Sequence, residues 1–493
     1  MCKEGRAYKG PKKREYSERS ETRVEFTFPC EEDITAKEKR ANHAGVTLPL
    51  ATCRGGASDL SQSVRLSSVA VPAHLKNLKR LFHSTHFGII CYFIWYLLFS
   101  YLHPSPLEDE PVHQNVIASF QHGNFFSELP MLPGYHWLIA TISHVPGPSL
   151  GLSRFLTCLI SAAMIALYAS IPQQQNGHSS KRSPLLLAFL PILFPYTSMV
   201  YTDAVALFFI IGAVYFRAKR LDIFAALSML IACLIRQSNM VWLIFMMAWS
   251  ALDAWDQCKR ENVLSRLSLW NIFTRHLLPK IFSSLVVLSF MSALLLSRGA
   301  VLYSDVSQNR LQPNIGNFYI LSFVALMLWA PIWLERARDD LRAFFLKIKT
   351  NPVQSSAIFL FFIALSSVLI TTFDNWHPWN ERPWYLHNIP LILMDKYISF
   401  RILGVISFFL TAWFVARFWS LQENRRHLLL LTFFTFLFLL PHPLVESRYL
   451  IVPFALASFF TNYTDAQTSK LTYWYFSISV VTCVIIASGH GML

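Results

Sequence analysis

Charge is scarce in this sequence, and so are the short motifs that mark metal- or nucleotide-dependent enzymes. Only 15% of the 493 residues are charged while 54% are hydrophobic, and the hydrophobic residues come in runs long enough to cross a bilayer. This composition argues against a soluble fold. HExxH, DxD and P-loop patterns are missing, which disfavours metal-dependent or nucleotide-sugar chemistry. We therefore predict neither a metal site nor a cofactor.

Cysteine pairs are lacking as well. The eight cysteines form no CxxC motif, and none falls in a segment that we expect outside the cytosol. A disulfide framework is therefore not predicted, and buried or reduced thiols are the expectation.

The formal net charge of +14 does not call for a nucleic-acid partner. Lys and Arg are interleaved between apolar runs, as the positive-inside bias of membrane proteins produces. Residues 1–80 carry mixed charges without an apolar period, and we predict that they form a disordered cytosolic extension. The membrane domain is expected over residues 86–490.

The apolar runs predict an all-α, polytopic membrane protein of about thirteen transmembrane helices. They lie at 86–103, 151–171, 185–200, 203–217, 221–236, 239–254, 279–298, 316–334, 354–372, 389–417 (one span), 427–441, 449–461 and 471–490. Several are short, and closely spaced runs leave tilted, bent or partly re-entrant paths open.

A cytosolic N-terminus gives a consistent orientation. Counting alternate spans from the N-terminus places the Lys- and Arg-rich loops in the cytosol, whereas the loop from His103 to Leu150 falls on the other side and contains no Lys or Arg. Within this luminal first loop, residues 133–145 predict a short interfacial helix with Tyr135 and Trp137 as anchors. A re-entrant segment is the alternative.

Polar clusters punctuate the apolar runs, and the same counting places all of them on the external side. They are Asp109-Glu110, Tyr201-Thr202-Asp203, Arg236-Gln237-Ser238-Asn239, Asp374 to His387, and His442 to Tyr449. Their common side of the membrane leads us to infer one site.

The carboxylates of Asp109 and Glu110 directly follow the first span. One of them has the chemistry to accept a proton from an attacking sugar hydroxyl; the alternative is a solvated acidic loop. Arg236 and Arg448 are candidates for a phosphate, because a guanidinium forks onto two phosphate oxygens. The alternatives are contacts with lipid headgroups and, for Arg448, a structural pairing with Glu446.

A loop rich in tryptophan supplies further candidates. Aromatic faces stack on sugars while polar neighbours bind hydroxyls; an aromatic belt at the membrane interface is the alternative. The candidate residues of this loop are Asp374, His377, Trp379, Arg382, Trp384 and Tyr385.

These motifs together resemble the endoplasmic-reticulum alpha-1,2-glucosyltransferases that use dolichyl-phosphate glucose, a family of the multi-spanning GT-C class. The matching pieces are Asp109-Glu110-x-x-His113-Gln114, Leu132-Pro133-Gly134-Tyr135, Tyr201-Thr202-Asp203-Ala204, Arg236-Gln237-Ser238-Asn239 with Trp242, and Glu446-x-Arg448-Tyr449-x-x-x-Pro453. One tract departs from the family, since its Arg-His pair appears here as Arg382-Pro383.

The resemblance implies an inverting transfer of glucose from dolichyl-phosphate glucose to the dolichyl-pyrophosphate oligosaccharide, in the luminal leaflet of the endoplasmic-reticulum membrane. It implies catalysis by Asp109 or Glu110. The substrate-binding residues would be His113, Gln114, Tyr201, Asp203, Arg236, Gln237, Asn239, Glu446 and Arg448, together with the loop residues named above.

Three alternatives remain open. The first is a transferase of another dolichyl-phosphate sugar, such as mannose, because one or two hydroxyl contacts decide sugar identity. The second is a transporter or channel, although the polar clusters lie at helix ends and no internal repeat stands out. The third is a non-catalytic relative with the same fold.

Overall fold

The computed structural model describes residues 84–123, 132–147, 149–171, 183–260, 269–297, 313–375, 378–383, 385 and 388–489. Contacts divide the chain into Met1–Ala70 and Val71–Leu493, so every described residue belongs to the second unit. Its regular elements are all helices within these residues, which confirms the predicted all-α polytopic class. The predicted cytosolic extension lies outside the described residues.

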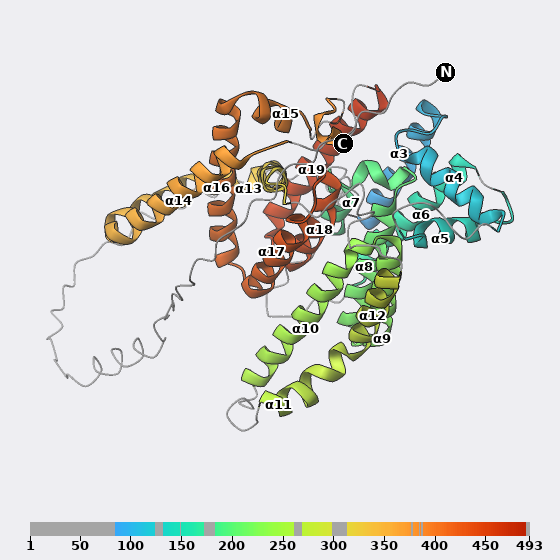
Figure 1. The fold of residues 1–493 in the computed structure, drawn as a ribbon, viewed down its shortest axis with the longest axis horizontal. Helices are drawn as coiled ribbons and strands as arrows, with labels where there is room; N and C mark the ends of the chain where they lie inside the picture. The colour runs from blue at the N-terminus through green and yellow to red at the C-terminus, as the bar shows by residue number, and fades with distance from the viewer. Residues whose placement is uncertain are drawn as a thin grey trace, which may run out of the picture. The chain divides into compact units, whose positions relative to one another are not determined.

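Seven helices are long and apolar enough to cross a membrane (Figure 1). They are α3 (Thr85–Leu102), α6 (Leu150–Ala169), α12 (Leu278–Ser297), α13 (Gly316–Thr350), α14 (Pro352–Thr372), α16 (Ile398–Ser420) and α19 (Asp465–Ala487). Among the side chains of α14, only Leu369 is buried. Exposed apolar side chains on such a helix suit a lipid environment, which covers them in place of protein.

Shorter helices occupy most of the other expected spans. They are α8 (Thr202–Ala218), α9 (Asp222–Ile235), α10 (Met240–Arg260), α17 (Arg425–Leu439) and α18 (Ile451–Phe460). Several have fewer than the ~20 residues that cross a bilayer without distortion. The count of about thirteen spans therefore stays a prediction.

The expected span at 185–200 is wrong as a continuous helix. The segment consists of the short helix α7 (Pro184–Ala188), a turn, and the 3-10 helix η2 (Phe194–Ser198), and residues 185–200 are all buried. Pro191 and Pro195 explain the break, because each proline lacks an N–H donor and clashes with the preceding helical turn.

The loop after the first span folds into two packed helices, α4 (Glu110–Gln121) and α5 (Gly134–Ile142). The role expected for Tyr135 is wrong: it is fully buried, and its Oη lies 3.1 Å from Thr157 Oγ1 of α6. Trp137 is 55% exposed. Tyr135 thus joins the first loop to the helical core and does not anchor α5 at the interface.

Small elements complete the fold. They are η3 (Gln237–Asn239), α11 (Leu269–Ile272), the π-helical turn η5 (Phe273–Leu277), η6 (Pro378–Glu381), α15 (Asn388–Lys396) and η7 (Ser447–Leu450). Most of them end or begin a long helix.

Consecutive helices run back and forth, so that alternate helix ends meet. Figure 1 shows α8, α9, α10 and α12 grouped together, and α17 packs on α10. Arg236 at the end of α9 pairs with Asp203 at the start of α8. At the opposite ends, Arg217 of α8 pairs with Asp253 of α10. The helical core therefore carries two separate polar ends, about 25 Å apart for a helix of 17 residues.

Candidate active site

The carboxylate of Asp109, at the start of α4, does not cap that helix. Asp109 occupies the N-cap position, where aspartate usually accepts a hydrogen bond from the helix, but its side chain makes no such bond. The preceding Glu108 has φ +50°, a left-handed conformation that costs a non-glycine residue energy and that clusters at functional sites. Local backbone thus presents Asp109 outward instead of using it as a cap.

Two arginines from distant parts of the chain reach this carboxylate region. Arg448, from η7, lies with Nη1 3.9 Å from Asp109 Oδ2 and donates from Nη2 to Glu446 at 2.7 Å. Arg236 follows α9 and pairs with the buried Asp203 of α8. Each arginine is therefore held in place by its own carboxylate.

Aromatic rings link the two ion pairs. The guanidinium of Arg448 lies 5.6 Å from the centre of the Tyr201 ring, and that of Arg236 lies 5.7 Å from the Tyr449 ring. The His442 ring stacks on Tyr449 with centres 4.3 Å apart. Cation–π contacts of this kind favour one orientation of each guanidinium.

The surroundings of Asp109 disfavour its charged form. Partial burial, the largest effect, raises its pKa above the usual value; Arg448 opposes the shift, and the carboxylates of Glu446, Glu108 and Asp203 add to it. A carboxylate with a raised pKa is better matched to proton transfer near neutral pH than an ordinary surface aspartate.

Glu110 has a different environment from its neighbour. It is fully buried and forms a two-pronged pair with Arg154, whose Nε and Nη2 donate at 3.0 and 2.5 Å. The backbone N–H groups of Leu107 and Val200 also donate to it, both at 2.9 Å. Four donors occupy its two oxygens, so Glu110 joins α4, α6 and the start of α8.

The remaining motif residues on the first loop and α9 lie in structural contacts. His113 Nδ1 is 2.8 Å from His136 Nε2, and Gln114 accepts a hydrogen bond from Ser153 at 3.0 Å. Asn239 donates to the Ala232 carbonyl at the end of α9 at 2.9 Å, and Gln237 is buried. These contacts fix the elements that carry Asp109 and Arg236.

The tryptophan-rich loop contributes one direct contact to the site. Tyr385 Oη donates to Glu108 Oε2 at 2.8 Å, next to Asp109. Arg382 stacks 3.5 Å from the centre of the Trp379 ring, and Asp374 is exposed. His377 and Trp384, two predicted residues of this loop, lie outside the described residues.

No group of three or more His, Cys, Asp and Glu side chains is arranged to hold a metal ion among the residues that the structure describes. The metal- and cofactor-free site stays a prediction.

Sequence reasoning did not single out Arg154, although it carried a signal. It is an arginine inside an apolar run, and a buried cation requires a carboxylate partner. The sequence also does not predict the contacts of Glu108 and Tyr449, because a contact 277 residues apart in sequence and a ring stack are set by the fold.

Comparisons with known proteins identify the family of the chain. The model of the DIE2/ALG10 family matches residues 103–459, a range that contains the clusters described above. An Arabidopsis thaliana protein named Dol-P-Glc:Glc(2)Man(9)GlcNAc(2)-PP-Dol alpha-1,2-glucosyltransferase is 23% identical over 487 residues, spanning 78% of this chain and 92% of that protein. No solved structure matches the chain. Because the family model covers well over half of its length, the chain belongs to the DIE2/ALG10 family and is a glycosyltransferase.

Proposed function

We propose that this protein transfers glucose from dolichyl-phosphate glucose to the lipid-linked oligosaccharide, forming an alpha-1,2 linkage in the endoplasmic reticulum. The donor, acceptor and linkage are those in the name of the Arabidopsis relative. The observation that carries the proposal is the meeting of the first loop, α8, α9 and η7: Arg448 lies beside the half-exposed carboxylate of Asp109, and Arg236 pairs with Asp203, whose charge acts on the same carboxylate.

Asp109 acts as the general base in this proposal. Its carboxylate takes the proton of the acceptor hydroxyl while the hydroxyl oxygen attacks the anomeric carbon of the donor. The bond from that carbon to the phosphate oxygen breaks, and dolichyl phosphate leaves with the electron pair. A single displacement turns a beta-linked donor into an alpha-linked product and needs no covalent enzyme intermediate.

Arg448 and Arg236 stabilise the departing phosphate. Both are partly buried and oriented by carboxylates and aromatic rings, so little reorganisation is needed when negative charge develops. Glu110 is assigned a positioning role, because its oxygens are occupied by Arg154 and two backbone donors.

The proposed orientation puts the site in the lumen and the N-terminus in the cytosol. The loop from His103 to Leu150 has no basic residue, and the opposite helix ends carry Arg217 to Arg220 and Arg425-Arg426. Accessibility mapping of single cysteines introduced at residues 105 and 425 tests this, and labelling of residue 105 from the cytosolic side contradicts it.

Two experiments test the function: deletion of the gene, and replacement of the proposed base Asp109. Cells without the protein should accumulate a lipid-linked oligosaccharide that is short of one glucose by mass. Microsomes with Asp109→Asn should show the same defect at normal protein level, whereas Asp339→Asn, an exposed aspartate on α13, serves as the charge-matched control and should transfer normally.

Donor competition separates this proposal from a mannose transferase with the same fold. Microsomes supplied with dolichyl-phosphate glucose should extend the acceptor, and dolichyl-phosphate mannose should not replace it. Extension with mannose alone refutes the glucose assignment, and normal transfer by Asp109→Asn refutes the assignment of the base.

A further inference from the structure

A second polar region lies at the helix ends opposite the candidate active site. A cavity of about 710 Å³ opens between the end of α8, the starts of α9 and α17, and the ends of α10 and α12 that face them. Its charged lining consists of Arg217, Arg220, Arg260, Lys280, Asp222 and Asp253. The family resemblance and the proposed function assign nothing to this cavity.

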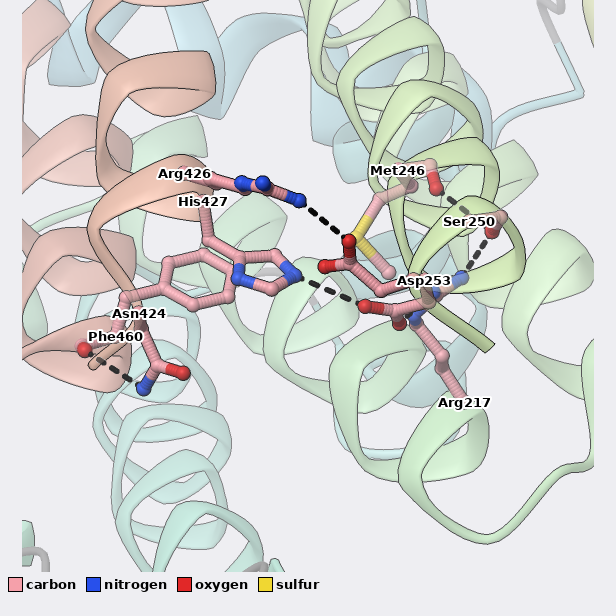
Figure 2. Close-up of polar contacts among 9 residues, drawn as sticks. Arg217, Met246, Ser250, Asp253, Asn424, Arg426, His427 and Phe460 are labelled. Carbon is pink, nitrogen blue, oxygen red and sulfur yellow. Dashed lines mark hydrogen bonds and ion pairs between the residues drawn. The ribbon is translucent and has the colours of Figure 1, made fainter. Parts of the chain in front are cut away.

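An ion-pair network forms one wall of the cavity (Figure 2). Asp253 of α10 accepts from Arg217 of α8 at 2.7 Å and contacts His427 Nε2 of α17 at 2.9 Å. Arg426 pairs with Asp256 at 2.6 Å. Figure 2 shows Arg217, Asp253 and His427 pointing toward one another from separate helices. The network neutralises Asp253 and fixes the relative positions of α8, α10 and α17.

Within the described part of the chain, the other cations of the cavity have no such neutralising partner. Lys280 donates to the neutral amide of Gln257, at 3.1 Å. The side chains of Arg220 and Arg260 form no hydrogen bond or ion pair with the residues that the structure describes, and both are exposed. Asp222, at the first turn of α9, is the one other carboxylate among the described lining residues. The described lining therefore has an excess of positive charge.

The backbone places one of these cations in an unusual conformation. Arg220 has φ +60° in the three-residue connection between α8 and α9, where asparagine or glycine is better tolerated than a long side chain. This conformation ends α8 with a left-handed cap, in which the N–H groups of Arg220 and Leu221 donate to the carbonyls of Arg217 and Phe216. The cap holds the backbone of Arg220 at the edge of the cavity, which its side chain lines.

We propose that this cavity binds a phosphate-bearing anion at the membrane face opposite the active site. Arginine and lysine that converge without carboxylate partners favour phosphate oxygens, and the volume lies in the range of small-molecule sites. The same chemistry is present in the headgroup of an anionic phospholipid and in free phosphate, so the experiment distinguishes these two sources.

Binding to the full-length protein tests the proposal. The protein is reconstituted in phosphatidylcholine nanodiscs, with or without phosphatidic acid, and separately titrated with inorganic phosphate; the readouts are the thermal unfolding midpoint and Trp fluorescence, to which Trp249 in the lining contributes. The cavity variant combines Arg220→Asn, Arg260→Gln and Lys280→Gln. The Asn at position 220 keeps a residue that tolerates the positive φ.

A matched variant removes the same charge from the same helix ends. It combines Lys219→Gln, Arg275→Gln and Arg425→Gln, which are exposed and do not line the cavity. We expect the cavity variant to bind roughly tenfold more weakly for each removed cation that contacts the anion, with the control unchanged. A shift with phosphatidic acid alone identifies a lipid headgroup, and a shift with inorganic phosphate identifies a soluble ligand.

Equal responses of the wild type, the cavity variant and the control to both probes overturn the proposal, as does a response that both variants lose alike. If the triple cavity variant fails to fold, Arg260→Gln and Lys280→Gln are compared singly with Arg275→Gln. Sugar transfer is measured in parallel: loss of the cavity ligand with intact transfer separates this cavity from the proposed active site.

Discussion

The main effect of replacing Glu110 should be a loss of folding stability, not the loss of a catalytic group. Glu110→Gln leaves the guanidinium of Arg154 buried without its counter-charge, and both side chains are at most 1% exposed. Breaking a buried ion pair from one side typically costs about 3–5 kcal/mol. In the variant, an amide NH2 group also replaces one carboxylate oxygen. This group cannot accept the hydrogen bonds that Arg154 and the backbone N–H groups donate to that oxygen in the wild type. We therefore expect that exchanging one carboxylate oxygen for an amide nitrogen causes a large loss of folding stability.

A double variant separates this structural effect from a catalytic one. Glu110→Gln with Arg154→Met removes both charges, and replacing a buried pair by neutral groups of similar volume is often close to neutral. The remaining cost is that of the other bonds of Arg154, to the carbonyls of His103 and Ser105 at 2.5 and 3.2 Å. The double variant should recover most of the lost 3–5 kcal/mol, as an order of magnitude.

The assay measures the thermal unfolding midpoint in detergent and sugar transfer per folded molecule. Glu110→Gln and Arg154→Met should each unfold at lower temperature than the wild type, and the double variant should unfold above either. Asp109→Asn should keep the wild-type midpoint while transfer stops. A Glu110→Gln protein that unfolds like the wild type and transfers no sugar would refute the reasoning and make Glu110 the base.

Three further predictions concern the site and its supports. Arg448→Met removes the cation that lowers the pKa of the proposed base, so the acidic limb of the pH profile of kcat/KM should move to higher pH; an unmoved limb contradicts the assignment. Gly134→Ala places a methyl group 2.6 Å from the α9 backbone, which should cost about 1–3 kcal/mol and lower the unfolding midpoint, whereas Gly151→Ala meets open space and should be tolerated. Burial and neighbouring cations lower the pKa of His113 to about 3, and burial lowers that of His136 to about 4. The unfolded chain therefore takes up protons first, and the unfolding midpoint should fall as the pH drops below about 6.5 toward 4; His136→Phe should make this fall shallower, and an equally steep fall contradicts the buried pair.

Apolar runs locate the helices of this fold because a membrane requires continuous apolar stretches whose backbone is satisfied internally. The runs at 86–103, 151–171 and 279–298 agree with α3, α6 and α12 to within two residues. The run at 185–200 does not form one helix, because the backbones of Pro191 and Pro195 break it, and a hydropathy average over the run does not register this break. Hydropathy also does not predict the full length of a helix, since α13 continues to Thr350 through charged residues.

Side-chain partners were harder to predict than helix positions. Counting spans predicts one face for the motif residues at helix ends, and in the structure Arg448 lies beside Asp109 while Arg236 pairs with Asp203, which acts on the same carboxylate. The division of roles between Asp109 and Glu110 was not available from two adjacent acids. It depends on Arg154, 44 residues later, whose side chain reaches back to the first loop only after α4 and α6 have packed.

The charge balance of the proposed active site favours the transition state over the bound donor. Asp203 and Glu446 already pair with Arg236 and Arg448, so a phosphodiester with one negative charge gains little from these arginines on binding. As the acceptor proton moves to Asp109, that carboxylate loses its charge while the departing phosphate gains one. Arg448, 3.9 Å from Asp109, then interacts more weakly with the protonated Asp109 and more strongly with the phosphate. An interaction that strengthens only as the bond breaks accelerates the reaction. A nucleoside diphosphate sugar would bring a second negative charge to these carboxylates before any bond breaks, so this charge balance is consistent with the lipid phosphodiester that we propose as donor.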